Sequence, residues 1–446
     1  MKTEELVQRD LLHIWHPCSQ MSEYKEYPPI LITRAKGVWL YTKDNRKILD
    51  AISSWWVNLF GHTNKKISKA IKKQLNRLEH VIFANYTHEP AIRLASELIK
   101  LFPGLTRVFF SDNGSTSIEV ALKMSWQFCQ QTGKDRNIFA YLGGAYHGET
   151  LGALSVGGLG IYKTIFQRLL FQAVEIPGPD CFRCPYNQNR NNCSTQCFEK
   201  TAETLEKIKD KTIAIIAEPI LQAAAGMRIY PPLFLKKLRE FTKENQIFLI
   251  CDEIAAGFGR TGKLMASYHA DIIPDFVCLS KGLTGGFLPL GVTITSEDIY
   301  NSFLGEREKA FLHSHSYTGN PLACIAGCEV MKIFKDPKTI EMINRKSKIL
   351  EEKLKIFNTL KHTGEVRQIG LVAAIELVKE KERKTPFDPV LRTGYKVYRT
   401  AEKKGVLLRN LGDVIYFMPP YTITEKEMDF MIKIAYNSIK EITENN

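Results

Sequence analysis

Short apolar runs separated by amphipathic stretches are the feature of this sequence that most restricts its fold. Each run has the length and composition of a strand buried on both faces of a sheet. Polar or glycine-containing residues follow each run at its C-terminal end. Such runs alternating with helical segments predict an α/β protein with a parallel sheet. The runs are Val108–Phe110, Ile138–Tyr141, Ile213–Ala217, Phe248–Cys251, Phe276–Leu279 and Gly291–Thr295.

The chain changes character after about Asp336. A long charged amphipathic segment (339–357) precedes two short strand-like runs (371–377 and 414–418) and a final helical pattern (425–442). This order predicts a smaller α+β domain, which the N-terminal segment is expected to join. The predicted division is residues 1–80 for the N-terminal part of the small domain, 81–335 for the large domain and 336–446 for the C-terminal part of the small domain.

Two neighbouring strand ends carry a carboxylate and an amine. Asp252 follows the run Phe248–Cys251, and Lys281 follows Phe276–Leu279. Parallel sheets bind ligands outside the carboxyl ends of their strands. Taken singly, Asp252 suits a helix cap and Lys281 a solvent-directed lysine. Together they suit pyridoxal phosphate (PLP), which needs a desolvated, nucleophilic Schiff-base lysine and an acid on its pyridinium nitrogen.

A helix start follows the first run and is a candidate phosphate site. Gly114 and Ser115 lie in the segment 111–116, just before a helical pattern. Backbone amides and hydroxyls at a helix N-terminus bind dianions, and glycine permits a close approach. Thr116 and Glu119 have the spacing of a capping box, which predicts where the helix begins.

A glycine-rich loop follows the run that ends at Tyr141. It carries Tyr146 and His147 between Gly143 and Gly148. An aromatic ring in this loop can stack on a planar cofactor, whereas the simpler interpretation is that the two side chains fill the loop. Glu218 similarly follows the run Ile213–Ala217.

The charge of the chain says little about partners. A formal net charge of +13 comes from 61 Lys and Arg scattered among 48 Asp and Glu. This pattern favours a basic solvated surface, able to attract carboxylate substrates, over nucleic-acid binding. No stretch of about 18 uncharged apolar residues and no apolar secretory signal is present, so we expect a cytoplasmic protein without a membrane partner.

Four of the ten cysteines are clustered in a polar, Asn-rich stretch. Cys181, Cys184, Cys193 and Cys197 form a C-x2-C-x8-C-x3-C pattern. Thiolates at such spacing can close a tetrahedral zinc site, although the central spacer is shorter than in common zinc modules. Two interpretations remain open, a zinc site and a loop of metal-free thiols. Neither gives these cysteines a part in the reaction.

Several motifs in order along the chain resemble the class III, fold-type I PLP-dependent aminotransferases. The resemblance extends from about His16 to Pro420 and rests on Ser-Asp-Asn-Gly-Ser, Ala-Tyr-His-Gly, Ala-Glu-Pro, Gly-Phe-Gly-Arg-Thr-Gly, Ser-Lys-Gly and Thr-Gly-Asn-Pro-Leu-Ala-Cys. It implies a large domain with a mostly parallel seven-stranded sheet flanked by helices, plus a smaller α+β domain. It also implies a homodimer whose active sites lie at the subunit interface.

The resemblance assigns roles to individual residues. Lys281 is expected to be catalytic. The expected cofactor-binding residues are Gly114, Ser115, Tyr146, His147, Glu218, Asp252 and Lys281, with His315 and Ser316 reaching the cofactor from the neighbouring subunit. The expected substrate-binding residues are Cys18, Trp55, Tyr146, Lys281, Ser314 and Arg409. A planar guanidinium such as that of Arg409 binds a carboxylate through paired hydrogen bonds, although a surface arginine is the simpler interpretation.

Within this class the chain is most similar to the biotin-pathway aminotransferases, through Ile14–Pro17, Ser53–Trp56 and Leu408–Gly412. This implies ping-pong conversion of 8-amino-7-oxononanoate to 7,8-diaminononanoate, with S-adenosylmethionine as the expected amino donor. Cys18 replaces a tyrosine of the S-adenosylmethionine-using members, and His313–Ser316 departs from their His-Gly-Pro-Thr, so lysine is the alternative donor. The rival functions are another class III ω-amino acid or diamine transaminase and a non-catalytic, charge-driven binding protein on the same fold.

Overall fold

A seven-stranded sheet forms the centre of the computed structural model, which describes residues 1–444. Its strand order is β4-β12-β11-β10-β7-β5-β6. The strands are β4 (Leu105–Ser111), β5 (Ile138–Leu142), β6 (Val174–Ile176), β7 (Thr212–Ala217), β10 (Phe248–Asp252), β11 (Phe276–Leu279) and β12 (Gly291–Ser296). All six predicted runs are therefore strands, and the α/β class is confirmed. The three-residue β6 was too short to be predicted.

One strand runs against the expected direction. β12 pairs antiparallel with both β11 and β4, whereas the other neighbours in the sheet are parallel. The prediction of a parallel strand at Gly291–Thr295 was wrong. Parallel neighbours need a crossover of about a dozen residues or more, usually a helix. The chain between Leu279 and Gly291 is too short and contains only a 3-10 turn, so the strand returns beside β11.

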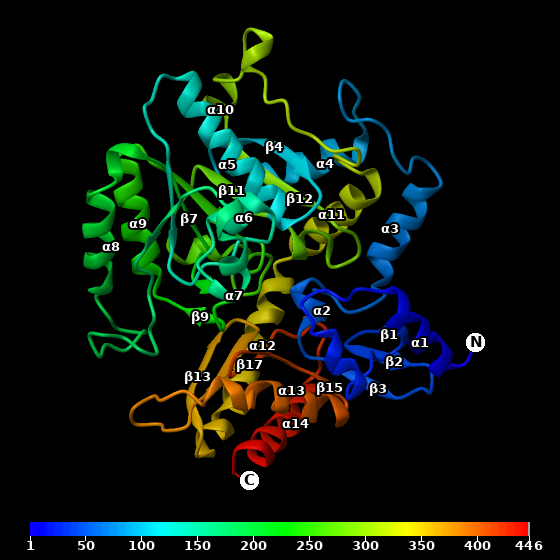
Figure 1. Cartoon of the computed structure of the whole chain (residues 1–446). Helices are drawn as coiled ribbons and strands as arrows, with labels where there is room; N and C mark the ends of the chain where they lie inside the picture. The colour runs from blue at the N-terminus through cyan, green and yellow to red at the C-terminus, as the bar shows by residue number, and fades with distance from the viewer. Residues whose placement is uncertain (445–446) are drawn as a thin grey trace.

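Helices cover both faces of the large sheet (Figure 1). On one face α5 contacts β11 and β12, and on the other α9 packs against β10 and α8 against α9. Further along, α11 packs against α3 and α4. These helices are α3 (Lys65–Leu75), α4 (Glu89–Leu98), α5 (Gly114–Gln131), α8 (Cys197–Glu206), α9 (Pro232–Glu244) and α11 (Pro321–Phe334). Such cover explains why every residue of β7 and β11 is buried.

Two four-stranded sheets lie below the large sheet in Figure 1. One contains β13 (Thr363–Ile369), β14 (Val372–Leu377), β17 (Val414–Phe417) and β16 (Arg409–Leu411). The other joins β1 (Ile32–Lys36), β2 (Trp39–Thr42) and β3 (Lys47–Asp50) to β15 (Val406–Leu407), which pairs parallel with β3. The helices of this region are α12 (Lys338–Leu354), α13 (Thr393–Lys403) and α14 (Glu425–Glu444). The N-terminal segment thus joins the C-terminal region by strand pairing, while the predicted domain boundaries stay predictions.

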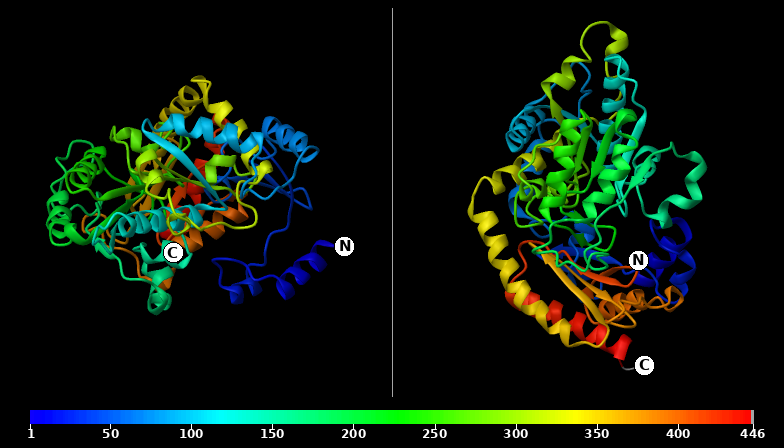
Figure 2. Two further views of the ribbon diagram at one scale, coloured as in Figure 1. Left: turned by 90° about the horizontal axis from the view of Figure 1, so that it is seen from above. Right: turned by 90° about the vertical axis from the view of Figure 1, so that its left-hand side faces the viewer.

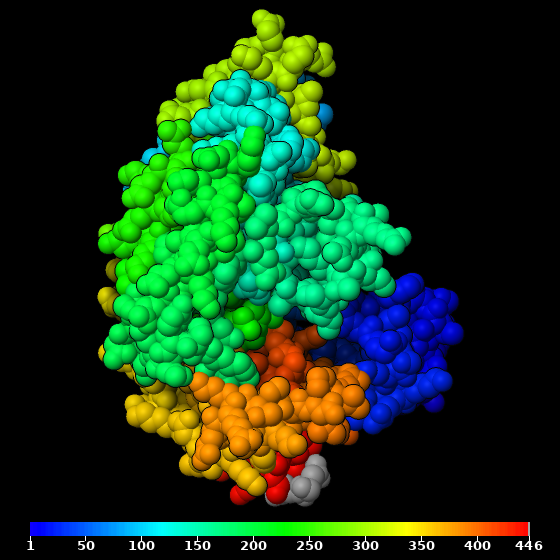
Figure 3. Space-filling model, turned by 60° about the vertical axis from the view of Figure 1, so that its left-hand side comes forward, coloured from blue at the N-terminus to red at the C-terminus, as the bar shows by residue number. Residues whose placement is uncertain are grey.

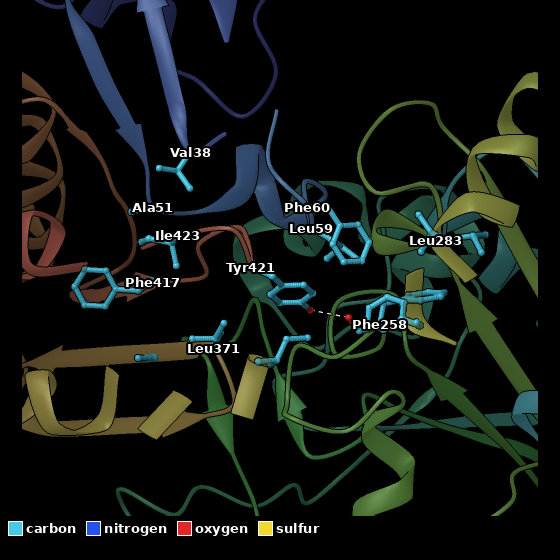
Figure 4. Packing of buried hydrophobic residues seen from close by; sticks show 14 of the residues in the cluster. Val38, Ala51, Leu59, Phe60, Phe258, Leu283, Leu371, Phe417, Tyr421 and Ile423 are labelled. Carbon is cyan, nitrogen blue, oxygen red and sulfur yellow. Dashed lines mark hydrogen bonds between the residues drawn. The ribbon is translucent and has the colours of Figure 1, made fainter. Parts of the chain in front are cut away.

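A continuous core connects the regions (Figure 4). Leu59 and Phe60 from the N-terminal segment, Phe258 from the large region and Tyr421 from the C-terminal region all belong to it. The Tyr421 hydroxyl donates a hydrogen bond of 2.6 Å to the Phe258 carbonyl oxygen. Burial of each large apolar side chain contributes about 1.5–3 kcal/mol, so this core holds the regions in a defined relation around the space between them.

The remaining elements are short or peripheral. The first helix, α1 (Thr3–His13), buries none of its residues and lies at the edge of the molecule (Figure 2). The others are α2 (Ser53–Trp56), α6 (Leu151–Ser155), α7 (Gly160–Lys163), α10 (Glu297–Asn301), β8 (Leu221–Gln222) and β9 (Arg228–Ile229). Among residues 1–444 no helix combines the length and the apolar character that crossing a membrane requires.

Candidate active site

A pocket of about 470 Å³ opens at the carboxyl ends of the parallel strands. In the space-filling view the molecule is hollowed between the large region, the N-terminal segment and the C-terminal region (Figure 3). The pocket is lined by seven of the nine predicted cofactor-binding residues, namely Gly114, Ser115, Tyr146, His147, Glu218, Asp252 and Lys281. They follow five different strands of one sheet, so the strand-end argument identified a real convergence of side chains.

The Lys281 amine lies in a desolvated position. Burial lowers the pKa of this amine from its ordinary value, although the neighbouring Asp252 and Glu218 carboxylates raise it. The Lys281 Nζ atom lies 4.9 Å from the centre of the Trp56 ring. A lowered pKa increases the fraction of neutral amine, which is the nucleophilic form, so Lys281 is suited to attack an aldehyde.

The Asp252 carboxylate is buried and oriented by two partners. Its Oδ2 lies 2.7 Å from Nδ1 of His147, and its Oδ1 accepts a hydrogen bond of 3.0 Å from the Ile254 backbone N–H. The Nε2 atom of His147 is buried and has no hydrogen-bond partner within residues 1–444. His147, predicted as a cofactor-binding residue, therefore contacts and orients the carboxylate predicted to bind the pyridinium nitrogen.

Glu218 is a second buried carboxyl group in the pocket. Its Oε1 accepts a hydrogen bond of 3.1 Å from the Tyr146 N–H, and its Oε2 accepts one of 2.9 Å from the Ala223 N–H. Burial raises the pKa of Glu218 to about 7, and the nearby Asp252 carboxylate raises it too, whereas His147 and the two backbone donors lower it. Glu218 therefore orders the loop that carries Tyr146 and keeps a proton up to near-neutral pH.

The start of α5 supplies donors for an anion. Its N-cap is Asn113, whose side chain accepts the Thr116 N–H at 3.1 Å, and the Thr116 hydroxyl oxygen accepts the Asn113 N–H at 3.0 Å. A Cβ atom on Gly114 would lie 3.0 Å from carbon atoms of Ile254, so only glycine fits there without a shift. The Thr116 N–H is thus capped, whereas the backbone N–H groups of Gly114 and Ser115, which line the pocket, can bind an anion.

The predicted capping box of Thr116 and Glu119 was wrong. Asn113 and Thr116 form the box, because the helix begins at Gly114. The Glu119 carboxylate is used elsewhere: its Oε1 accepts a hydrogen bond of 2.7 Å from the Gly152 N–H. Sequence spacing alone cannot distinguish two overlapping pairs of capping residues, since both have the same separation.

The wall facing Lys281 is a left-handed turn in α2. Four consecutive residues have positive φ: Ser53 (51°), Ser54 (45°), Trp55 (71°) and Trp56 (73°). This conformation costs an L-residue about 1–2 kcal/mol. The Trp56 indole N–H donates to the Tyr416 hydroxyl at 3.1 Å. Sequence reasoning selected Trp55 and missed Trp56, although the two are adjacent in the same Ser-Ser-Trp-Trp motif.

Trp55 and Arg409 lie together although they are far apart in the sequence. The Arg409 guanidinium carbon lies 4.5 Å from the centre of the Trp55 ring. Arg409 and Cys18 line a neighbouring cavity of about 410 Å³. The pKa of the Cys18 thiol is raised by burial and by Glu149, and lowered by Arg409, so these three groups are close enough to interact. Sequence reasoning missed Glu149, whose Oε1 accepts a hydrogen bond of 2.9 Å from the Tyr146 hydroxyl.

The segment Ser314–Ser316 lies outside the pocket of its own chain. Ser314 and Ser316 are exposed. The His315 ring nitrogens have no hydrogen-bond partner within residues 1–444, and Nδ1 lies 3.7 Å from Oδ2 of Asp112. The structure therefore does not bring these three predicted residues to the Lys281 pocket of a single chain.

The four clustered cysteines surround one small cavity. Cys181, Cys184, Cys193 and Cys197 all line a space of about 170 Å³, and burial raises the pKa of Cys181 to about 12. In the part of the chain that the structure describes, no three His, Cys, Asp or Glu side chains are grouped so that they could hold a metal ion. The predicted zinc site thus gains no support from this geometry and stays a prediction.

Comparisons with known proteins agree with this site. The sequence profile described as "Aminotransferase class-III" matches residues 20–439. An adenosylmethionine-8-amino-7-oxononanoate aminotransferase of Aquifex aeolicus is 42% identical over 443 residues, covering 97% of this chain and 96% of the relative. The crystal structure of the same-named enzyme of Methanocaldococcus jannaschii has a TM-score of 0.93 at 38% identity, covering 99% of both chains.

A third relative carries the cofactor in its structure. An amine transaminase from an uncultivated Pseudomonas species, solved in its PLP-bound form, has a TM-score of 0.91 at 30% identity, covering 96% of this chain and 98% of the other. The pocket fits that cofactor: it offers a desolvated amine, a buried carboxylate and an open helix N-terminus beside a glycine that a Cβ atom would crowd. The expected cofactor is thereby confirmed, and the chain belongs to the class III aminotransferases, which are PLP-dependent transaminases.

Proposed function

We propose that this transaminase converts 8-amino-7-oxononanoate to 7,8-diaminononanoate, a step of biotin biosynthesis. The observation that carries the proposal is the contact between Arg409 and Trp55 beside the Lys281 pocket. A nonanoate has a carboxylate at one end of a long aliphatic chain. The guanidinium suits the carboxylate and the indole face suits the chain. The names of the Aquifex and Methanocaldococcus relatives support the same substrate.

The residues of the pocket have different proposed roles in the reaction. PLP, when bound, supplies an electron sink for the negative charge that develops on the substrate carbon. Asp252 is suited to hold the pyridinium nitrogen, and Gly114 and Ser115 to bind the phosphate. Lys281 would hold the cofactor through its amine. The neutral amine of Lys281 would also accept and return a proton at Nζ, for which its lowered pKa is favourable.

The amino donor is proposed to be S-adenosylmethionine, which the relatives' names include. Donor and acceptor must use the same pocket in turn, so the kinetics are expected to be ping-pong. Cys18 offers a thiol where S-adenosylmethionine-using members have a tyrosine, which makes lysine the second candidate. The donor is identified by supplying each compound with 8-amino-7-oxononanoate and measuring diamino product.

We further propose a cytoplasmic homodimer in which Ser314, His315 and Ser316 complete the site of the partner subunit. The support is that neither ring nitrogen of His315 has a hydrogen-bond partner in the described part of the chain, and that its neighbours Leu312 and Tyr317 are 76% and 62% exposed. All ten cysteines are free, as expected in a reducing compartment. Analytical ultracentrifugation tests the dimer, and a monomer that is fully active would contradict it.

The decisive experiment is the assay with 8-amino-7-oxononanoate. We expect diamino product from one of the two donors. An enzyme that gives no such product and instead takes its amino group from an ω-amino acid or a diamine would be another class III transaminase. A non-catalytic binding protein on this fold is the remaining rival. It is tested by the visible absorbance of lysine-linked cofactor, which we expect in the wild type and not in Lys281→Ala.

A further inference from the structure

A buried carboxylate that no part of the chemistry uses, that of Asp50, accepts hydrogen bonds from the middle of the left-handed turn Ser53–Trp56. We propose that Asp50 is a positioning residue of the active site, which keeps this turn in its left-handed form so that Trp55 faces Arg409 and Trp56 faces Lys281. The substrate-side half of this statement rests on the function proposed above. The half that concerns Lys281 requires only that the protein is a transaminase.

Asp50 is fully buried, and two of its four side-chain hydrogen bonds go to Ser54 in the turn. Its Oδ1 accepts the backbone N–H groups of Ile52 at 3.2 Å and Ser54 at 2.9 Å. Its Oδ2 accepts the Ser54 hydroxyl at 2.8 Å and lies 2.9 Å from Nε2 of His62. Backbone donors that a left-handed turn leaves unpaired are thereby satisfied, and hydrogen bonds to a charged acceptor are the stronger kind.

His62 extends the same network to the end of the turn. Its Nδ1 lies 2.9 Å from Nδ2 of Asn58, the second residue after the turn. An amide nitrogen only donates, so Nδ1 of His62 is the acceptor and the ring proton of the neutral form is on Nε2, where it points at Asp50. The Asp50 carboxylate therefore receives donors from both sides of the turn and has no oxygen left without a partner.

The turn determines what two functional side chains contact. Lys281 Nζ lies 4.9 Å from the Trp56 ring centre, and the Arg409 guanidinium carbon 4.5 Å from that of Trp55. Neither serine nor tryptophan favours positive φ, so the turn persists only where the surrounding structure imposes it. Asp50 provides both side-chain hydrogen bonds at Ser54, whereas other groups hold the two ends of the turn: Ser53 donates to the Met418 carbonyl oxygen and Trp56 to the Tyr416 hydroxyl.

Asparagine at position 50 provides the sharpest test, because it keeps the volume and removes an acceptor. The amide NH2 of the new asparagine would face a group that already donates, either at Ser54 or at His62, so at least one hydrogen bond would be lost. In Asp50→Asn we expect kcat/KM for amino transfer to fall about ten- to hundredfold, with KM for the carboxylate substrate rising and kcat falling. The visible absorbance of the bound cofactor should persist, because Asp50 contacts none of the predicted cofactor ligands.

A second substitution separates positioning from mere stability. Glycine adopts positive φ without strain, so Ser54→Gly should restore a large part of the activity of Asp50→Asn. Activity that does not recover, or an unchanged kcat/KM in Asp50→Asn, would overturn the proposal. Asp44→Asn, an exposed carboxylate on the same segment, is the matched control and should behave like the wild type. If Asp50→Asn fails to fold, His62→Gln carries the test, with an expected loss of about three- to tenfold that Ser54→Gly again reverses.

The test of Asp50 can be separated from the test of the proposed substrate. The half-reaction with any amine that bleaches the cofactor absorbance is measured for wild type and variant. A wild type that ignores 8-amino-7-oxononanoate refutes the proposed substrate. The role of Asp50 is judged separately, from the half-reaction rate of Asp50→Asn divided by that of the wild type with the same amine.

Discussion

The two sides of the pocket are built in different ways. On the cofactor side, Asp252 ends β10, Lys281 follows β11, and Gly114 begins α5 after β4, so the chemistry stands on one buried sheet. On the substrate side, Trp55 comes from a left-handed turn and Arg409 from a three-residue strand at the edge of a different sheet. The reaction centre is thus placed by regular structure. The proposed substrate-binding residues instead lie on a left-handed turn and a short edge strand, which can vary without disturbing the large sheet.

The largest effect is expected on the cofactor side, at Lys281. Lys281→Ala removes the amine that anchors the cofactor and moves the proton, so activity should fall by at least about a thousandfold. The visible absorbance of lysine-linked cofactor should disappear as well. Lys263→Ala, an exposed lysine in the same region, is the control. Retained absorbance in Lys281→Ala would break the comparison, because another amine would then be the anchor.

Arg409 tests the substrate side. Arg409→Ala should weaken binding of the carboxylate substrate by about 2–5 kcal/mol, seen as a raised KM with the cofactor absorbance unchanged. The matched control is Arg383→Ala, an exposed arginine that pairs with Glu380 and lines neither the Lys281 pocket nor the Arg409 cavity. An unchanged KM would remove Arg409 from the pocket and leave the substrate side without its carboxylate partner.

Glu218 makes the cofactor side sensitive to pH in the cofactor-free protein. Folding raises the pKa of Glu218 from its ordinary value of about 4.5 to about 7. Between these pH values the folded state binds a proton that the unfolded state has released. The free energy of unfolding therefore falls as pH rises through this range, by about 3 kcal/mol.

The measurement is a series of unfolding curves from about pH 4.5 to about pH 7. Glu218→Gln carries no titrating carboxyl group and should show a flatter profile than the wild type. Glu253, whose pKa burial also raises, remains in both proteins, so the difference between the two curves isolates Glu218. Parallel profiles would show that folding does not shift the pKa of Glu218.

The smallest effect is expected at the cap of α5. Asn113→Ala should lower the free energy of unfolding by about 1 kcal/mol and also weaken cofactor binding, because the cap orders the predicted phosphate-binding turn. Ser296→Ala removes the cap of α10, away from the pocket, and should lower stability alone. Equal cofactor affinity in the two variants would show that the first turn of α5 does not hold the phosphate.

The cofactor side was largely predictable from the sequence because its signals are local. A strand buried on both faces must be continuously apolar, so the polar residue that ends it is conspicuous, as at Asp252 and Lys281. The predictions failed where the sequence pattern was weak or where it fitted two structures equally well. β6 has only three residues, and the capping spacing fits both Asn113–Thr116 and Thr116–Glu119. The direction of β12 depended on a connection length that the apolar pattern does not describe.

The sequence by itself determined the fold class, the order of the strands along the chain and the positions of Asp252 and Lys281, the two groups proposed to define the chemistry. Only the tertiary structure decided that His147 orients Asp252, that Trp56 lies under Lys281 and that Trp55 meets Arg409. The physical reason is that burial patterns are local properties of a chain. A left-handed turn of serines and tryptophans is instead unfavourable locally and exists because contacts such as those of Asp50 hold it in place.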